Sequence, residues 1–539
     1  MTANLRNFFQ VIIVRTSFPP LSLLYKILYM IAVRRAVLVL GSVNGVEAIY
    51  LRRGVSRNEI VYGLSDIDLS VIVNDNKKSG MTSVKEKVRS AYNRLSRFIP
   101  LFGQANREFE LYSTSEFFRL YADYPILKYR FNEGKNTWRL LFGRDIVKDL
   151  PKLQESELYL TATKELEVWW SLVNAEFSST HPLPQFGRKY LWYKAIAEAS
   201  KVYLLICYGE KIYRREAALS EVRKYLNEEQ NQCIEQVRRY MKNLTSKDNF
   251  LVDDVMKLFM ELTSHACSEM ERKVYGRTTR KRAMLPGLDC NDLIIEKEVS
   301  HKLEEIERYI QRELVAHLDY VSLVPQIYLG MNVLHNSDID SLHLVLAQKD
   351  FIPVKKLRGL DSLLGKVRSP QELELLIKYK NVFLSLRIKT KFDCIWTPGK
   401  CPLFYSLVNY FLLDVIKKSE RRKAFLSILP PDFEDCIRKR VARINEVISD
   451  PDVYKMKTLS FLRFFWGATR TKLLNNLLES DCIYIPLTSR QICEMASQRF
   501  PENSEWLNGL YGEYRKELQE EESQAYRFFT KSIDFLKRI

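Results

Sequence analysis

The chain has 539 residues, of which 46% are hydrophobic and 28% charged, and it carries a net charge of +17. This length exceeds what one hydrophobic core usually organises, and the composition excludes extended disorder, so we expect several folded domains. The nine cysteines form no C-x-x-C pair, which argues against structural zinc and a disulfide framework and favours a reducing cytoplasm.

The most apolar stretch, residues 18–40, is interrupted by Lys26, Arg34 and Arg35, so no membrane-spanning helix is expected. Residues 1–10 lack the apolar core and cleavage site of a secretory signal. The basic charge attracts polyanions such as nucleotides, RNA or acidic membrane surfaces without choosing among them. Solvated lysines and arginines explain any single basic cluster equally well.

The first predicted elements are a helix and a strand. Leu21 to Arg35 follows two prolines and has apolar residues three or four apart, which predicts a helix. Ala36 to Leu40 is a short apolar run ended by Gly41, which predicts a buried strand and a tight turn.

Two more strands are predicted further along, with a helix between them. Ile67 to Val73 alternates in polarity and predicts a strand that begins with two carboxylates. A helix is expected over residues 84–98. In Arg107 to Leu111, glutamates alternate with Phe109 and Leu111, which predicts a third strand.

The carboxylates of these strands suggest chemistry. Asp66 and Asp68 stand two residues apart, so on a strand they point to one face and offer hard oxygen ligands to magnesium. The Gly41-Ser42 turn is expected to lead into a helix, where backbone N–H groups can hold a triphosphate. A two-metal site needs a further carboxylate. Glu110 is our prediction, and Glu108, on the same face, remains the alternative.

The segments Val37–Ser42 and Gly63–Val71 together resemble the polymerase beta superfamily of nucleotidyltransferases. Within it, residues 1–230 are most similar to aminoglycoside adenylyltransferases of the streptomycin and spectinomycin type. The resemblance implies a mixed sheet with helices, two Mg²⁺ ions, and ATP or another nucleoside triphosphate as substrate. It implies catalytic and metal-binding roles for Asp66, Asp68 and Glu110, and nucleotide binding by Gly41, Ser42 and Ser65.

The resemblance continues into a helical region. Leu140 to Asp145 is similar to the G-x-D segment that follows the catalytic strands in the family. Lys201 and Arg215, with Arg214 as a substitute for the latter, are implied as ligands of the ATP phosphates. Twenty-two residues separate Ser42 from Ser65, about twice the family's usual spacing, which predicts an inserted loop at the site. That loop carries Arg52, Arg53 and Arg57.

Beyond the first sheet, the chain turns helical from Ser156, with breaks at His181–Pro184 and near Gly209. Lys273 to Gly287 is basic and closes on Pro-Gly, which predicts an interdomain linker. The fold class expected is α+β. The expected domains are a nucleotidyltransferase domain over 1–150, a helical domain over 151–272, an α/β-like domain over 288–400 and a C-terminal helical domain over 401–539.

The letters S-D-I-D recur at residues 337–340, before an apolar run that starts at Leu342. One interpretation is that residues 288–400 are a degenerate duplicate of the nucleotidyltransferase domain. Another is a metal site made by His335, Asp338, Asp340 and His343, and a loop that enters a strand is the simplest reading.

The leading hypothesis is a cytoplasmic, magnesium-dependent nucleotidyltransferase that moves AMP from ATP onto a hydroxyl of an acceptor. A small hydroxyl compound, an RNA 3′ end and a protein side chain all remain open as the acceptor, and the basic charge slightly favours RNA. The rival hypothesis is a nucleotide- or RNA-binding regulatory protein that keeps the fold without turnover.

Overall fold

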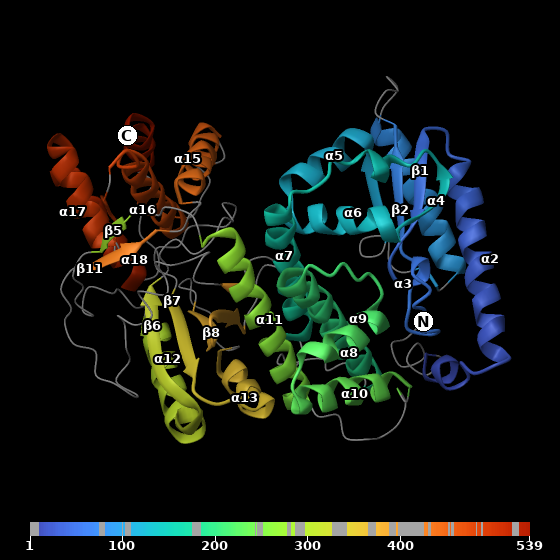
Figure 1. Cartoon of the computed structure of the whole chain (residues 1–539). Coiled ribbons are helices and arrows are strands. Elements are labelled where there is room, and N and C mark those ends of the chain that lie inside the picture. The colour runs from blue at the N-terminus through green and yellow to red at the C-terminus, as the bar shows by residue number, and fades with distance from the viewer. Residues whose placement is uncertain are drawn as a thin grey trace. The chain divides into compact units, whose positions relative to one another are not determined.

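The computed structural model describes most of the chain, and its cartoon is drawn in Figure 1. Two compact units comprise residues 1–173 with 182–266, and residues 174–181 with 267–539. The described residues are 10–74, 81–99, 101–102, 109–174, 185–242, 244, 252–276, 282–285, 297–325, 342–364, 373–386, 395–396, 425–429, 433–450, 453, 458–480, 482–486, 489–519 and 528–539.

The first unit contains a four-stranded sheet in the order β3-β2-β1-β4. Its strands are β1 (Val46–Leu51), β2 (Leu69–Val73), β3 (Phe109–Ser113) and β4 (Arg139–Gly143). β1 pairs antiparallel with β2 and with β4, whereas β2 and β3 run parallel. The expected strands over 67–73 and 107–111 are thus confirmed within a few residues, and so is the α+β class.

Helices cover both faces of this sheet because its strands alternate their apolar side chains (Figure 1). Leu69, Val71 and Val73 enter one core with α2 (Leu21–Gly41) and α4 (Met81–Phe98). Ile72 enters the opposite core. That second core is completed by α5 (Thr114–Asp123), α6 (Pro125–Thr137) and the short η1 (Ile146–Asp149).

The strand predicted over Ala36 to Leu40 is wrong, because α2 continues through these residues to Gly41. Val33, Ala36 and Leu40 are buried at helical spacing, so the inward face of the helix runs on without a break. A five-residue apolar run does not by itself distinguish a strand from a buried helix segment. The first strand is instead β1, which begins after the turn at residues 42–45.

Gly143 ends β4 with a positive φ of 77°. A Cβ atom built on Gly143 would lie 1.8 Å from the carbonyl oxygen of Glu47 in the neighbouring strand. Only glycine therefore allows β4 to close against β1 at this point. The following Asp145 accepts a hydrogen bond from the Tyr50 hydroxyl at 3.1 Å, which fixes the chain leaving the sheet.

The rest of the first unit is helical, as expected from Ser156 onward. Its helices are α7 (Glu155–Asn174), α8 (Gln185–Tyr203), the π-helical η2 (Leu204–Tyr208), α9 (Arg215–Val222), η3 (Arg223–Tyr225), α10 (Glu228–Lys242) and α11 (Val252–Val274). The break near Gly209 is confirmed, because this residue caps η2 in the left-handed conformation with φ of 76°.

The second unit contains a five-stranded sheet in the order β10-β9-β8-β7-β6. Its strands are β6 (Leu318–Pro325), β7 (Leu342–Gln348), β8 (Leu373–Tyr379), β9 (Val382–Ser385) and β10 (Ile395–Trp396), and its helical segments are α12 (Lys297–Tyr309), η5 (Ile310–Leu314), η6 (Val315–His317) and α13 (Val354–Leu364). The α/β character expected for 288–400 is present. The S-D-I-D residues 337–340 and His335 lie outside the described residues.

A three-stranded sheet, β11-β5-β12, also belongs to this unit. Its strands are β5 (Arg282–Leu285), β11 (Phe425–Ile428) and β12 (Cys482–Tyr484). β5 lies inside Lys273 to Gly287, the segment predicted to be an interdomain linker. That prediction is wrong for Arg282–Leu285, because their backbone pairs with β11 and with β12.

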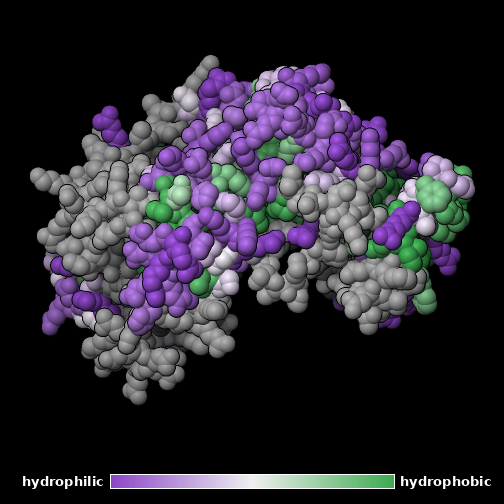
Figure 2. All heavy atoms as spheres, turned by 90° about the horizontal axis from the view of Figure 1, so that it is seen from below, coloured by the Kyte–Doolittle hydropathy of each residue, from purple (hydrophilic) through white to green (hydrophobic). Residues whose placement is uncertain are grey.

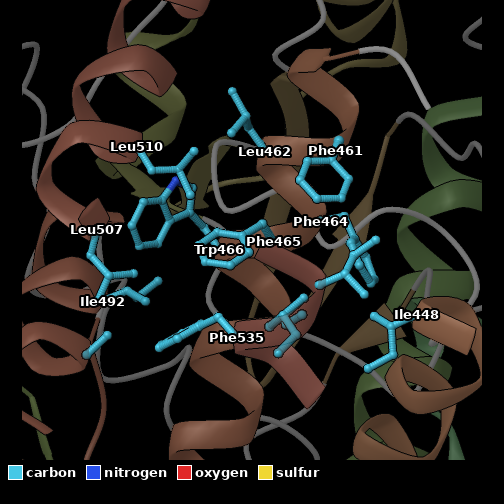
Figure 3. Close-up of a cluster of buried hydrophobic side chains, with 14 of the residues drawn as sticks. Ile448, Phe461, Leu462, Phe464, Phe465, Trp466, Ile492, Leu507, Leu510 and Phe535 are labelled. Carbon is cyan, nitrogen blue, oxygen red and sulfur yellow. The ribbon is translucent and has the colours of Figure 1, made fainter. Parts of the chain in front are cut away.

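The C-terminal helices enclose an aromatic core, shown in Figure 3. Phe461, Phe465 and Trp466 project from one helix into this core and are fully buried. The helical segments around it are α15 (Phe433–Ser449), α16 (Thr458–Asn475), α17 (Ser489–Arg499), η8 (Pro501–Asn503), α18 (Ser504–Gln519) and α19 (Phe529–Arg538). In the part of the chain that the structure describes, no helix is long and apolar enough to cross a membrane.

Candidate functional site

The segment Ser65-Asp66-Ile67-Asp68 lies immediately before β2. The Ser65 hydroxyl accepts a hydrogen bond from the Val61 N–H at 2.9 Å and lies 3.1 Å from the Tyr190 hydroxyl. The Ser65 carbonyl accepts a hydrogen bond from Tyr29 of α2 at 2.5 Å. Ser65, predicted to bind nucleotide, thus holds the loop that presents the two aspartates.

Glu110 lies beside this segment on the parallel strand. In the β2–β3 register Glu110 is opposite Ser70, two residues beyond Asp68. The Ser70 hydroxyl donates to Glu110 Oε2 at 3.1 Å. The structure therefore brings Glu110 to the same sheet face as Asp68, whereas Glu108 lies outside the described residues and stays an open alternative.

Arg52, which follows β1, binds Glu110. Its Nη1 lies 2.7 Å from Glu110 Oε1, its guanidinium carbon is 5.4 Å from the centre of the Trp138 ring, and the Arg52 side chain is only 4% exposed. The Arg52 backbone N–H donates to the Asp68 carbonyl at 3.0 Å. A buried cation is thus built into the end of β1, next to both carboxylates.

Arg53 approaches the aspartate from the same turn. Its Nη1 lies 3.4 Å from Asp68 Oδ1, and its side chain is 41% exposed. The backbone of Arg53 has a φ of +53°, which a residue with a side chain rarely adopts. Asp68 Oδ1 itself is buried and accepts no hydrogen bond from any described residue.

These charges set the ionisation of Glu110. Burial opposes its charged form, but the positive charges of Arg52 and Arg53 outweigh burial and hold the pKa of Glu110 below its ordinary value. For the neighbouring Tyr112, burial and the negative charge of Glu110 raise the pKa of the phenol. Glu110 is therefore a carboxylate at neutral pH, and Tyr112 is a neutral hydrogen-bond donor.

Lys194 of α8 is a candidate that the sequence reasoning missed. Its Nζ lies 4.2 Å from the centre of the Tyr190 ring, and it pairs with no carboxylate among the described residues. Burial lowers the pKa of Lys194 to about 8, and the positive charges of Arg215 and Arg53 add to this effect. Asp68 and Asp66 act in the opposite direction. The aspartates therefore favour the charged form of Lys194, which is lost as the pH rises through about 8.

A signal for Lys194 was present in the sequence. Lys194 stands seven residues before Lys201 on the same helix, a spacing that returns to the same helix face. Nothing in the letters alone says which of two cations on one face points at the aspartates, because that choice depends on how α8 packs against the sheet.

The predicted phosphate ligands Lys201 and Arg215 lie in a buried ion network. Lys201 Nζ is 2.7 Å from Glu198 Oε2 and also contacts Glu133. Arg215 Nε donates to Glu198 Oε1 at 2.9 Å, and its backbone N–H donates to Glu59. Lys201 also borders a small cleft with Glu133 and Tyr213 among its lining residues. A phosphate would have to displace a carboxylate to reach either cation.

Arg57 joins this network from the loop between β1 and β2. It lies 3.3 Å from Glu133 and 3.9 Å from Glu198. Coulomb attraction to these glutamates raises the pKa of the Arg57 guanidinium despite its burial. Three cations and three glutamates thus balance inside the first unit, and they fasten the loop that carries the arginines to helices α8 and α9.

The remaining predicted nucleotide ligands, Gly41 and Ser42, lie at the C-terminal end of α2. The Ser42 hydroxyl donates to the Val39 carbonyl at 3.0 Å, and a strand rather than a helix follows. A helix C-terminus presents carbonyl oxygens and negative partial charge, which repel phosphate. The expectation that the Gly41-Ser42 turn leads into a helix is therefore wrong, and nucleotide binding by these two residues stays a prediction. The segment that faces Asp68 is Arg52 together with the short helix α3 (Arg53–Ser56) that follows it.

The donor set only partly fits two magnesium ions. Asp66 and Asp68 are hard oxygen donors, but Asp68 Oδ1 forms an ion pair with Arg53 at 3.4 Å and accepts no hydrogen bond from any described residue. Glu110, the third donor, is occupied by Arg52. Within the described ranges, no group of three or more His, Cys, Asp or Glu side chains has the proximity needed to hold a metal ion.

Comparison with known proteins leaves the family open: no protein-family model matches the chain, and no curated protein matches it either.

Proposed function

We propose that the first unit is a magnesium-dependent nucleotidyltransferase of the polymerase beta type, which moves a nucleoside monophosphate, AMP from ATP, onto a hydroxyl of an acceptor. The observation that carries the proposal is one juxtaposition. Asp68 immediately precedes β2, and Glu110 lies on β3, which runs parallel to β2. Arg53 forms an ion pair with Asp68, and the charge of Lys194 interacts with the charges of both aspartates.

The metal would be held first by Asp66 and Asp68. When bound, divalent cations would neutralise phosphate charge and make the acceptor oxygen a better nucleophile. Glu110 is ionised, so it is suited to a metal or to the acceptor proton once Arg52 has turned to another anion. A triphosphate is such an anion, and it would draw Arg52 and Arg53 away from the carboxylates.

The cations supply the rest of the binding energy. Lys194 in its protonated form attracts phosphate oxygens without giving up an existing ion pair, unlike Lys201. Arg53 is 41% exposed and held at 3.4 Å from Asp68, so its release costs less than that of the buried Arg52. The acceptor stays open between a small hydroxyl compound, RNA and protein.

A second candidate is a nucleotide-binding protein without turnover. The buried pair of Arg52 and Glu110 favours it, because a permanently placed arginine supplies the positive charge that a metal ion would otherwise bring. In that case the triphosphate binds to the arginines and Lys194, and no metal is required.

Two measurements on the full-length chain distinguish the candidates. ATP binding is measured by equilibrium dialysis with magnesium or with a chelator, and pyrophosphate release is measured with α-labelled ATP and cell extract as the source of acceptors. The transferase predicts magnesium-dependent release that Glu110→Gln abolishes while ATP binding survives. Glu86→Gln, at an exposed position of α4, is the matched control and keeps full activity.

The opposite result supports the second candidate. ATP binding that persists in the chelator, with no pyrophosphate release in any extract, rejects turnover and keeps the nucleotide site. Absence of ATP binding under both conditions rejects both candidates.

A further inference from the structure

Helix α2 is apolar on both of its faces. The inward face packs Tyr29, Val33 and Leu40 into the core of the sheet. The outward face also consists of large aliphatic side chains, each between 47% and 68% exposed: Leu23, Leu24, Ile27, Leu28, Ile31 and Leu38. From Leu23 to Ile31 these residues recur at spacings of three to four, and Leu38 returns to the same face seven residues after Ile31, beyond Arg34 and Arg35; we call this set the α2 stripe.

The α2 stripe stands out on the molecular surface. Green side chains gather at the right-hand end of Figure 2, where α2 lies in Figure 1. Single exposed aliphatic residues are ordinary, but a contiguous group of this length on one helix marks an interaction surface.

The charged residues of α2 itself are all positive. Lys26, Arg34 and Arg35 are exposed on the same helix, and none of them pairs with a carboxylate among the described residues. The first 46 residues of the sequence contain no aspartate or glutamate at all. The helix that carries the stripe therefore has no acidic residue of its own to repel an anionic partner.

We propose that the α2 stripe docks on an anionic lipid surface, with the aliphatic side chains entering the boundary between headgroups and acyl chains and the three cations contacting the headgroups. Apolar area together with basic residues is the combination that binds such a surface, and each part alone binds weakly. The helix lies along the surface in this arrangement and does not cross it.

Lipid docking brings the candidate site close to the membrane. Tyr29 on the inward face of α2 donates a hydrogen bond from its hydroxyl to the Ser65 carbonyl at 2.5 Å. The α2 stripe and the loop that carries the aspartates therefore lie on opposite sides of the same helix. Docking by the stripe does not depend on nucleotidyl transfer, and it is measured without nucleotide.

The test is cosedimentation of the full-length chain with vesicles of phosphatidylcholine alone or with about one third phosphatidylserine. We expect binding to the anionic vesicles, weakened by salt, and little binding to the neutral ones. The double variant Ile27→Glu/Ile31→Glu should lose binding at least tenfold, and Arg34→Glu/Arg35→Glu should lose its salt-sensitive part. Thermal unfolding followed by circular dichroism verifies that both variants fold.

The matched control is Phe98→Glu, which places the same charge on an apolar side chain that is 85% exposed at the end of α4. Phe98→Glu adds one negative charge where the double variant adds two, and it should bind vesicles as the unaltered chain does. The proposal is wrong if the unaltered chain ignores anionic vesicles, or if the folded Ile27→Glu/Ile31→Glu variant binds them equally well. A dimer in light scattering that this variant converts to monomer, without vesicle binding, would assign the stripe to a second copy of the chain instead.

Discussion

The sheets of the two units share a pattern of strand pairing. In the first, a helix leads to β1, which pairs antiparallel with β2, and α4 then leads to β3, parallel to β2. In the second, α12 and two short helical turns lead to β6, which pairs antiparallel with β7, and α13 leads to β8, parallel to β7. β2 and β7 each follow the letters S-D-I-D, which stand at residues 65–68 and 337–340.

The likeness extends to one pair of residues. Ser70, the second residue of β2, is opposite Glu110 and donates to it. His343, the second residue of β7, is opposite Glu374, with Nδ1 3.3 Å from Glu374 Oε2. The two glutamates stand in similar tetrapeptides, E-F-E-L at 108–111 and E-L-E-L at 372–375. The pattern supports the duplicate interpretation, which stays a hypothesis.

The difference lies in the cations. Arg52 follows Leu51, the residue opposite the first position of β2. The residue in that place beside β7 is Pro325, and the sequence continues with Gln326 and Ile327, which carry no charge. The same strand order can therefore hold two different chemistries, because the side chains at strand ends decide what a site binds.

The largest effect expected is on activity. Asp68→Asn keeps the side-chain shape but removes the charge next to the strand entry, so transfer should fall about a thousandfold or more, which corresponds to about 4 kcal/mol. Asp340→Asn, the matched change in the second S-D-I-D, should leave the rate unchanged. Pyrophosphate release measures both. A near-normal rate for Asp68→Asn refutes the mechanism, and a loss in Asp340→Asn means that the second region contributes to the activity.

The next largest effect concerns stability. Glu198→Gln leaves Lys201 and Arg215 without their shared carboxylate inside the first unit, which should cost about 3–5 kcal/mol. Among the described residues Glu374 pairs with His343 alone, so Glu374→Gln should cost about 1 kcal/mol or less. Hydrogen exchange of α8 and β7 peptides measures the two effects separately. Equal protection of α8 in both variants would contradict the role given to the network.

The same network predicts a pH dependence. Burial opposes the charged form of Glu198, but Lys201 and Arg215 outweigh it and lower the pKa of Glu198 in the folded chain. The stabilisation is therefore complete above the ordinary glutamate pKa and is lost as the pH falls through the folded value. In the Glu198→Gln variant, the protection of α8 against hydrogen exchange should depend less on pH in the acidic range.

A smaller effect is expected from Lys194. Because burial lowers its pKa to about 8, the charged form that attracts phosphate declines above that pH. ATP affinity should then fall up to about tenfold for each pH unit above 8. Lys194→Arg should remove the decline, since arginine stays charged. Lys378 on β8, whose Nζ lies 5.2 Å from the Tyr320 ring centre, is the matched position, and Lys378→Arg should change nothing.

The smallest effect belongs to Ser42. Within the part of the chain that the structure describes, its hydroxyl binds a carbonyl of its own helix and nothing else, so Ser42→Ala should change ATP affinity by no more than about 0.5 kcal/mol. Equilibrium dialysis measures the ATP affinity of the variant, and a clear loss of affinity would show that the Gly41-Ser42 turn contributes to nucleotide binding.

The sequence by itself determined the elements with strong periodicity or strong alternation. The helix over 84–98 and the strand over Ile67 to Val73 were predicted, the strand because its polarity alternates with a period of two. Glu110 was placed on a strand beside the aspartates for the same reason.

Only the tertiary structure decided the remaining features. Ala36 to Leu40 is helical because α2 buries an unbroken face against the sheet, and a short apolar run has no period of its own. Arg52 pairs with Glu110 and Arg53 with Asp68, while Lys201 and Arg215 pair with Glu198, because the packing of α8 and the end of β1 determines which cation meets which carboxylate. Charge pairing in a folded protein depends on distances across elements, and these are not encoded in the spacing along the chain.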